Sequence, residues 1–222
     1  MGGSESTLIS SADDEQIVQG LDATGYKAST KTTLVENIRN ADKKAGDAKK
    51  AYGNGISVKG IIANVSAKHY LQRTNQKKVM GKDWNDTDVS LPYNSMGPLN
   101  TTHFFDAKRD GASKGTRGGV TYTVIDKDSL IQGYVAIAWE NPYMGDFVFC
   151  VLVSKTEDLL DKCLNHCDNN SHSKIGGYVE KKLEGKIKKF ITANVMSANK
   201  STAYLVVGIK TDDLVREVLD EL

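Results

Sequence analysis

The sequence lacks the features of several large protein classes. Lys and Arg together number 29 against 28 for Asp and Glu, so the formal net charge is +1, without the broad basic excess typical of nucleic-acid binding. No apolar run approaches the ~20 residues that a membrane-spanning helix needs. The first residues, MGGSESTLISSADDEQ, show no basic segment followed by an apolar one, so no secretory signal is visible. We expect a globular protein with no nucleic-acid partner.

Cysteines, histidines and catalytic motifs are scarce as well. Cys163 and Cys167 are four residues apart and His166 lies between them, a set that suits zinc, but no second ligand pair follows at metal-site spacing. We therefore expect no metal and no other cofactor. The four histidines have no serine or carboxylate partner at a motif spacing. The segment GTRGG is not followed by the Lys-Ser/Thr of a phosphate-binding loop, so no enzymatic activity is predicted.

The most informative stretch is residues 115–155. Three apolar or β-branched runs at 120–125, 131–139 and 147–153 are separated by short segments rich in turn residues. Such runs predict strands joined in an antiparallel meander. The middle run is apolar on both of its alternating faces, so we expect that strand to be covered on both sides and central in a packed sheet.

Strand signals continue on both sides of this meander. They recur at short intervals between turn-rich segments, which is typical of an all-β sandwich rather than of βαβ units. A surface helix is expected at 156–167. The predicted fold class is therefore mainly β, an antiparallel β-sandwich flanked by α-helices with an N-terminal amphipathic helix. The further strands are expected at 56–65, 68–72, 77–80, 87–91, 99–105, 187–195 and 203–209, and residues 178–183 are expected to form a strand or a turn. The divisions are a flexible segment at 1–32, the amphipathic helix at 33–52, the sandwich at 53–210 and a C-terminal helix at 211–222.

Residues 33–52 carry the pattern of the amphipathic helix. Apolar residues recur at alternating intervals of four and three, which places one stripe along a helix with lysines around the rest. The following Gly53-Asn54-Gly55 ends the helix and offers a hinge. One interpretation is a helix that packs on the sheet through a weak, Ala-rich stripe, and the residues alone favour it. The other is a detachable helix that binds a membrane surface. The stripe consists of Leu34, Ile38, Ala41, Ala45, Ala48 and Tyr52.

Four segments, in their order and spacing, resemble one known family. They are GIIANVSAK at 60–68, VSLP at 89–92, GTRGGVTY at 115–122 and AIAWENPY at 136–143. The resemblance is to the actinoporins, the sea-anemone pore-forming toxins, and it runs from about residue 33 to residue 210. It implies a secreted protein that attaches to lipid headgroups of a target membrane, self-associates into oligomers and inserts the helix at 33–52.

The same resemblance implies a ligand site. Actinoporins bind the phosphocholine headgroup of sphingomyelin with a Ser, a Pro and several tyrosines. Pro142 matches the Pro, whereas Glu140 takes the place of the Ser, and the aromatic loop after Tyr143 is cut to Met-Gly-Asp. Most of the aromatic cage that a quaternary ammonium needs is therefore missing. The alternative is a non-lytic module that binds a glycan or a lipid headgroup at this end. The implied ligand-binding residues are Ser66, Ala112, Trp139, Glu140, Pro142 and Tyr143.

Two further patterns concern the surface. A lysine cluster at 181–189 would meet anionic headgroups or would simply be a solvated sheet edge. Five Asn-x-Ser/Thr sequences would carry glycans if the chain enters the secretory route. The lysines are Lys181, Lys182, Lys186, Lys188 and Lys189, and the sequences begin at Asn64, Asn85, Asn100, Asn169 and Asn199.

Overall fold

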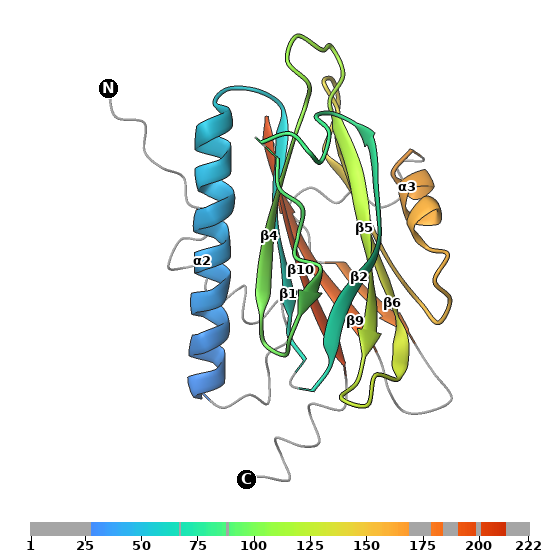
Figure 1. Cartoon of the computed structure of the whole chain (residues 1–222). Coiled ribbons are helices and arrows are strands. Elements are labelled where there is room, and N and C mark those ends of the chain that lie inside the picture. Colours follow the sequence, from blue (N-terminus) through green and yellow to red (C-terminus); the bar gives the residue numbers. More distant parts are fainter. Residues whose placement is uncertain are drawn as a thin grey trace.

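Two five-stranded β-sheets pack face to face, and each carries one helix on its outer face (Figure 1). The computed structural model describes residues 28–66, 68–87, 89–168, 179–183, 191–198 and 201–211. Helix α2 (Ala28–Tyr52) lies on the first sheet and helix α3 (Leu160–Asp168) on the second. The first sheet has the order β4 (Thr101–Ala107), β1 (Ser57–Asn64), β10 (Thr202–Thr211), β9 (Ile191–Ala198) and β8 (Val179–Leu183). The second has the order β3 (Ser95–Met96), β2 (Tyr70–Met80), β5 (Thr116–Ile125), β6 (Ile131–Asn141) and β7 (Val148–Ser154).

The predicted fold class is confirmed, and so is the meander β5–β6–β7. Ile137 pairs with Val120 of β5 on one side and with Val151 of β7 on the other, both antiparallel. One pair departs from the antiparallel pattern, because β1 runs parallel to β10 from Ser57↔Thr202 onward. These two strands lie far apart in the chain, so no hairpin fixes their relative direction.

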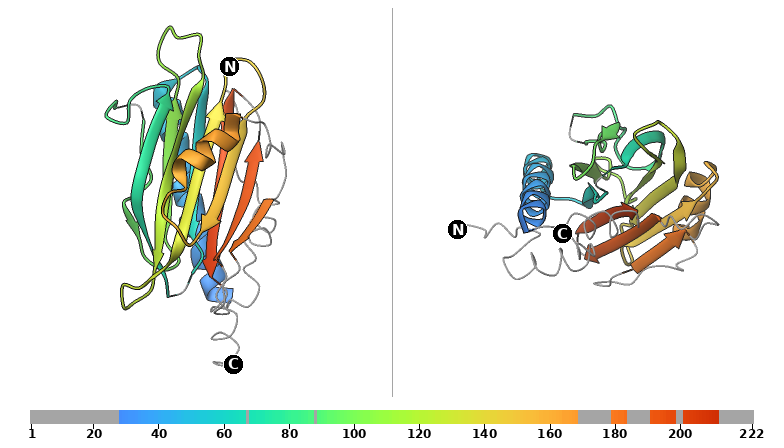
Figure 2. Two further views of the ribbon diagram at one scale, coloured as in Figure 1. Left: turned by 90° about the vertical axis from the view of Figure 1, so that its right-hand side faces the viewer. Right: turned by 90° about the horizontal axis from the view of Figure 1, so that it is seen from below.

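Strand β6 has two buried faces, as its apolar run predicts. Val135, Ile137 and Trp139 point into the interior between the sheets and belong to the main core cluster. Ala136 and Ala138 point the other way, where α3 covers them. Figure 2 shows α3 lying across the outer face of its sheet and α2 standing beside the opposite sheet.

Several boundaries differ from the prediction. Strand β2 is continuous over Tyr70–Met80, where two short strands were expected, and it has register shifts at 73/75 and 78/80. Its middle is polar and mostly exposed, so it lacks the apolar signal of a strand. In the expected strand at 87–91, of which residue 88 is undescribed, the described residues form the isolated bridge Ser90↔Phe105. Helix α2 begins at Ala28 rather than at 33, and α3 begins at Leu160 rather than at 156.

Parts of the predicted divisions fall on residues that the structure leaves undescribed. Residues 1–27 lie outside the described part, whereas residues 28–32 of the predicted flexible segment belong to α2. The C-terminal helix expected at 211–222 also lies outside the described part, apart from Thr211, which ends β10.

Candidate functional site

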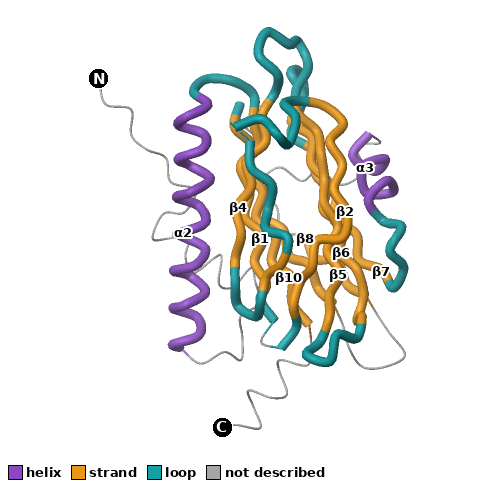
Figure 3. Tube along the Cα trace, in the orientation of Figure 1, coloured by secondary structure: helices purple, strands orange, loops and turns teal. Residues whose placement is uncertain are grey.

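The end of the sandwich at which α2 ends collects several connections, drawn as loops in Figure 3. We call it the loop end; it comprises residues 53–56, 81–87, 108–115 and 142–147. Asn141 ties the two sheets together there, since its side-chain amide donates to the carbonyl of Ser57 at 2.9 Å and to that of Ser201 at 3.2 Å. The loop end is therefore a fixed platform rather than a set of independent loops.

Residues 108–115 and 142–147 are in direct contact. A Cβ at Gly115 would clash with the carbonyl oxygen of Asn141 and would lie 2.6 Å from the Cα of Pro142. Beyond Pro142 the chain turns outward and returns at Phe147, which is buried. At the tip Tyr143 is 56% exposed and Met144 is 84% exposed. The loop end thus presents an aromatic and an apolar side chain to solvent.

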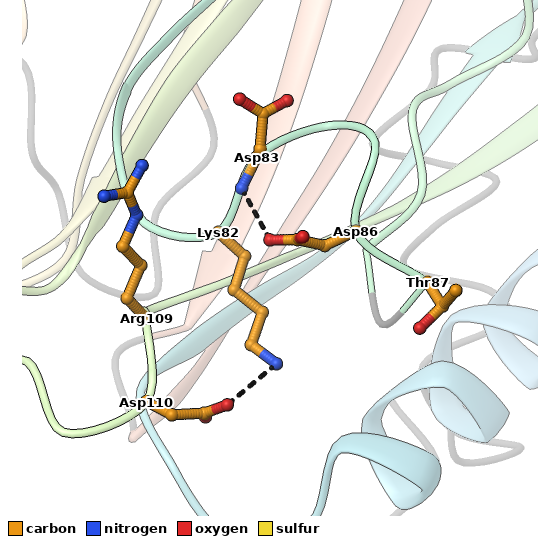
Figure 4. Close-up of a pocket in the computed structure, with 6 residues that line it drawn as sticks. All are labelled: Lys82, Asp83, Asp86, Thr87, Arg109 and Asp110. Carbon is orange, nitrogen blue, oxygen red and sulfur yellow. Dashed lines mark hydrogen bonds and ion pairs between the residues drawn. The ribbon is translucent and has the colours of Figure 1, made fainter.

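A charged cavity of about 410 Å³ opens at the same end (Figure 4). The backbone N–H of Asp83 donates to the Asp86 carboxylate at 2.9 Å, and Lys82 pairs with Asp110 at 3.2 Å. Arg109 donates from Nε to the carbonyl of Gly81 at 2.9 Å. Cations and carboxylates thus share one site, which matches a ligand that carries both charges. The lining residues are Lys82, Asp83, Asp86, Thr87, Arg109 and Asp110.

A buried polar network lies within the core near this end. The indole N–H of Trp139 donates to Asp106 at 2.7 Å, and its ring stacks on Phe104 at 4.3 Å. Lys78 forms an ion pair with Asp106 and lies 4.4 Å from the ring centre of Trp84. Burial lowers the pKa of Lys78 to about 7, while nearby aspartates act in the opposite direction. Because Asp106 is in direct contact, we expect the ammonium form at neutral pH.

The structure separates the six predicted ligand residues. Ala112, Pro142 and Tyr143 all lie in connections of the loop end. Trp139 is fully buried in the core, so it is not part of a surface groove. Glu140 points to the α3 face, where it lies 3.7 Å from Arg117.

Ser66 lies at the opposite end of the molecule. Strand β1 starts at the loop end with Ser57, which is held by Asn141, and finishes with Asn64. Ser66 follows and is fully buried, so it cannot share a site with Pro142. The local match at 60–68 was sound as a strand signal but did not predict where the serine lies.

Helix α2 packs through the predicted stripe. Leu34, Ile38, Ala41 and Ala45 are buried, and Ala48 and Tyr52 are half-buried. The first three pack with Ile61, Ala63, Val65 and Val206 of the sheet beneath.

Two charged residues beside this stripe were missed by the sequence reasoning. Asp42 and Lys59 form an ion pair at 3.3 Å, and both side chains are almost fully buried. The ammonium also lies 4.6 Å from the ring centre of Tyr204. The available signal was a lysine inside an otherwise apolar strand, because a buried lysine needs a partner.

The predicted hinge after α2 is cross-linked rather than loose. Gly53 has φ 80° and its N–H donates to the carbonyl of Lys49 at 3.0 Å, which closes the helix. Lys49 donates back to the carbonyl of Gly53 at 2.7 Å and to that of Gly55 at 3.2 Å. Tyr52 donates to the carbonyl of Lys108 at 3.2 Å and its ring meets Phe105 at 5.7 Å.

The metal, thiol and lysine candidates from the sequence do not belong to the loop end. Within the described ranges, no group of three or more His, Cys, Asp or Glu residues is arranged to hold a metal ion. Cys163 is buried on the inner face of α3, its thiol donates to the carbonyl of Cys150 at 3.1 Å, and burial raises the pKa of this thiol. Lys181 and Lys182 belong to β8, but their side chains, like residues 186, 188 and 189, are outside the described part.

The predicted glycosylation sequences differ in their accessibility. Asn64 is fully buried and its amide donates to the carbonyls of His69 and Gly97 at 2.8 and 2.9 Å, so it is not accessible to a glycan. Asn85 and Asn100 are exposed. Asn169 and Asn199 lie outside the described residues.

No family model matches the sequence, and no curated protein matches it either. Among solved structures, the chain is similar to the lipid-binding protein Nakanori, with a TM-score of 0.62, 19% identity, and coverage of 88% of this chain and 96% of that one. It is also similar to the lectin XCL of Xerocomus chrysenteron (TM-score 0.40, 11% identity, coverage 69% and 99%). The RahU protein gives a TM-score of 0.37 at 11% identity, with coverage of 70% and 93%. The first likeness shows a shared fold, and the other two are too distant to support an argument.

Proposed function

We propose that this protein is a secreted, actinoporin-like protein that binds lipid headgroups at a membrane surface through its loop end. The observation that carries the proposal is the exposed pair Tyr143-Met144 on the platform that also holds the charged cavity. The overall likeness to a lipid-binding protein supports it. No catalytic role is proposed.

The exposed pair suits the interfacial layer of a bilayer. A tyrosine ring is apolar with a polar tip, so it sits well at the headgroup level. Met144 offers an apolar side chain that would reach further toward the acyl chains. The turn at Gly145, with φ 111°, holds both residues at the tip of their loop.

The cavity suits a zwitterionic headgroup. Arg109 uses Nε for the Gly81 carbonyl, which leaves its terminal nitrogens to face a phosphate. The carboxylates of Asp83 and Asp110 are exposed and would face an ammonium group. A purely anionic headgroup would instead meet three carboxylates against two cations.

Vesicle sedimentation with variants from both ends of the sandwich tests this proposal. Tyr143→Ala and Met144→Ser should weaken binding to sphingomyelin and phosphatidylcholine vesicles roughly tenfold, about 1.4 kcal/mol. Arg109→Gln should weaken binding to these vesicles without a change in the thermal unfolding midpoint. The matched control is Leu130→Ser, because Leu130 is 62% exposed on the turn at the opposite end. Equal binding by the first three variants, or loss of binding in the control, would contradict the proposal.

A second step, pore formation by α2, is favoured by the length and position of that helix. Its 25 residues span ~38 Å at about 1.5 Å per residue, more than the ~30 Å hydrocarbon core. It lies on the outside of one sheet, where it can move away without opening the core (Figure 2). In the described part of the chain, no helix has both the length and the apolarity to cross a membrane. Inserted α2 helices would therefore have to associate in an oligomer and turn their polar faces to a water-filled lumen.

The alternative is a module that binds but does not lyse. The anchored Tyr52 favours it, since its hydroxyl and its ring tie the end of α2 to the sandwich. A disulfide between cysteines at Asn37 and Thr101, where the Thr101 hydroxyl lies 2.9 Å from the Asn37 carbonyl oxygen, separates the two functions. Pore formation requires vesicle leakage only after reduction of that disulfide. Equal leakage before and after reduction would exclude insertion of α2, and binding without leakage in either state would establish the non-lytic module.

A further inference from the structure

A second hollow lies between α2 and β4, away from the loop end. It has a volume of about 240 Å³. Helix α2 contributes one wall, and β4 together with the segment before it contributes the other. We call it the side groove; its lining residues are Asn37, Asn40, Ala41, Lys44, Tyr93, Asn100, Thr101 and His103.

The walls of the side groove are set by regular structure. The helical residues follow the spacing i, i+3, i+4, i+7, so they share one face of α2. Thr101 and His103 are two apart in a strand and therefore share one face of β4. The walls are joined directly, because Asn37 donates to the carbonyl of Leu99 at 3.1 Å and Thr101 donates to the carbonyl of Asn37 at 2.9 Å.

Tyr93 offers a fixed aromatic surface at the side groove. Its N–H donates to the Thr102 hydroxyl at 2.8 Å, and its carbonyl accepts from the Tyr122 hydroxyl at 2.8 Å. The ring stands edge-on to His103, with centres 6.2 Å apart, and the residue is 48% exposed. A ligand would therefore meet a ring whose backbone is already ordered, which lowers the entropic cost of binding.

Polar groups in the side groove have unused hydrogen-bonding capacity. Within the described part of the chain, the side chains of Asn40, Asn100 and His103 make no hydrogen bond. Burial, aided by the charge of Lys44, lowers the pKa of His103 below its usual value, so the ring is neutral near pH 7. A neutral imidazole donates from one nitrogen and accepts at the other, as each amide also does from its two ends.

We propose that the side groove binds a neutral, hydroxyl-rich ligand the size of a single sugar ring. Paired donors and acceptors on amides and an imidazole match neighbouring hydroxyls, which both donate and accept. The Tyr93 ring can cover the apolar C–H face of such a ring. The volume is below the ~300–1,000 Å³ of sites for drug-sized ligands. Among the described residues no carboxylate lines the groove, so they offer a choline group no counter-charge, and this site is separate from the headgroup site of the proposed function.

A titration of the whole protein with methyl glycosides of galactose, glucose, mannose and N-acetylglucosamine tests the proposal, with phosphocholine as the charged control. We expect saturable binding of at least one glycoside, measured by calorimetry or by chemical-shift changes. Asn40→Ala and His103→Ala should each weaken it roughly tenfold through a lost hydrogen bond. Asn85→Ala removes an exposed amide elsewhere and Tyr143→Ala alters the loop end, so both should leave the Kd unchanged. The absence of saturable glycoside binding, or unchanged affinity in both groove variants, would overturn the site, as would a loss of binding in Tyr143→Ala.

The ligand would contact α2 and the sandwich together, so its binding should also hold the helix in place. Hydrogen exchange of the backbone amides at 34–45 should slow when the glycoside is added and stay unchanged in His103→Ala. Binding without slower exchange would overturn the placement of the site between α2 and β4. No vesicle is used, so these results are independent of the test for headgroup binding.

Discussion

Helices α2 and α3 both cover the outer face of a sheet, but different contacts attach them. Helix α3 meets its sheet through leucines and the buried thiols of Cys163 and Cys167. Helix α2 meets its sheet through a narrow stripe with several alanines, and the buried Asp42–Lys59 pair lies beside that stripe. Since Ala buries little apolar area, the stripe holds a 25-residue helix weakly, and polar contacts supply the rest of its attachment.

The difference in attachment determines which helix can move away from its sheet more easily. If α2 moves away, Asp42 and Lys59 both enter water and recover their hydration, which offsets the lost ion pair. If α3 moves away, Leu160, Leu164 and the buried thiols enter water without such an offset. The two attachments thus make α2 the element whose release costs less per residue, as the pore-forming step would require.

The largest expected effect comes from removing one partner of the ion pair that lies between α2 and its sheet. Lys59→Met removes the ammonium that neutralises Asp42 and should lower the free energy of unfolding by about 3–5 kcal/mol. Urea denaturation measures the loss. The double variant Asp42→Leu/Lys59→Met should recover most of it, because an apolar pair of similar size replaces the ions. A double variant as unstable as the single one would show that the pair itself, and not its imbalance, fixes the helix.

The corresponding change on the other helix is Leu164→Ala. Leu164 is buried in the α3 cluster, so truncation leaves a cavity and should cost about 2–5 kcal/mol. Because this attachment is apolar and separate from the ion pair, the loss should be the same in the wild-type chain and in the Asp42→Leu/Lys59→Met double variant. A loss that differs between these two backgrounds would remove the distinction between the helices.

The sequence predicted those features that depend on local patterns. The meander and the doubly buried β6 follow from runs of apolar residues, and the α2 stripe follows from its spacing. The parallel pair β1–β10 did not follow, because it joins strands from opposite ends of the chain. The polar middle of β2 gave no strand signal, and its residues are held in the sheet by pairing with β5.

The candidate site was predicted less well. Pro142 and Tyr143 lie at the loop end as the resemblance implies. A match of short segments, however, does not show which of the matched residues lie close together in the folded chain. Ser66 therefore appeared to belong with them although it lies at the other end. The charged cavity was missed because its lining comes from two separate connections, 82–87 and 109–110, neither of which has a motif.

Thiol labelling compares the two helices within one molecule. Cys163 is buried on the inner face of α3 and reports its opening, while Ala45→Cys places a buried thiol on the inner face of α2. If α2 opens at a lower free energy, the new thiol should react about tenfold faster with a maleimide, equivalent to about 1.4 kcal/mol. Equal rates would mean that both helices open together with the whole fold, and α2 would then have no separate release.

The smallest expected effect concerns the anchor at the end of α2. Tyr52→Phe keeps the ring against Phe105 and removes only the hydrogen bond to the carbonyl of Lys108. One such bond contributes about 0.5–1.5 kcal/mol, so exchange of the amides at 49–52 should quicken by a similar free energy while global stability changes little. The matched control is Tyr93→Phe, since the hydroxyl of Tyr93 makes no hydrogen bond within the described residues, and exchange in α2 should not change. If Tyr52→Phe also leaves exchange unchanged, the anchor is the ring packing alone, and the glycine-bounded end of α2 is free to bend without breaking a hydrogen bond to the sandwich.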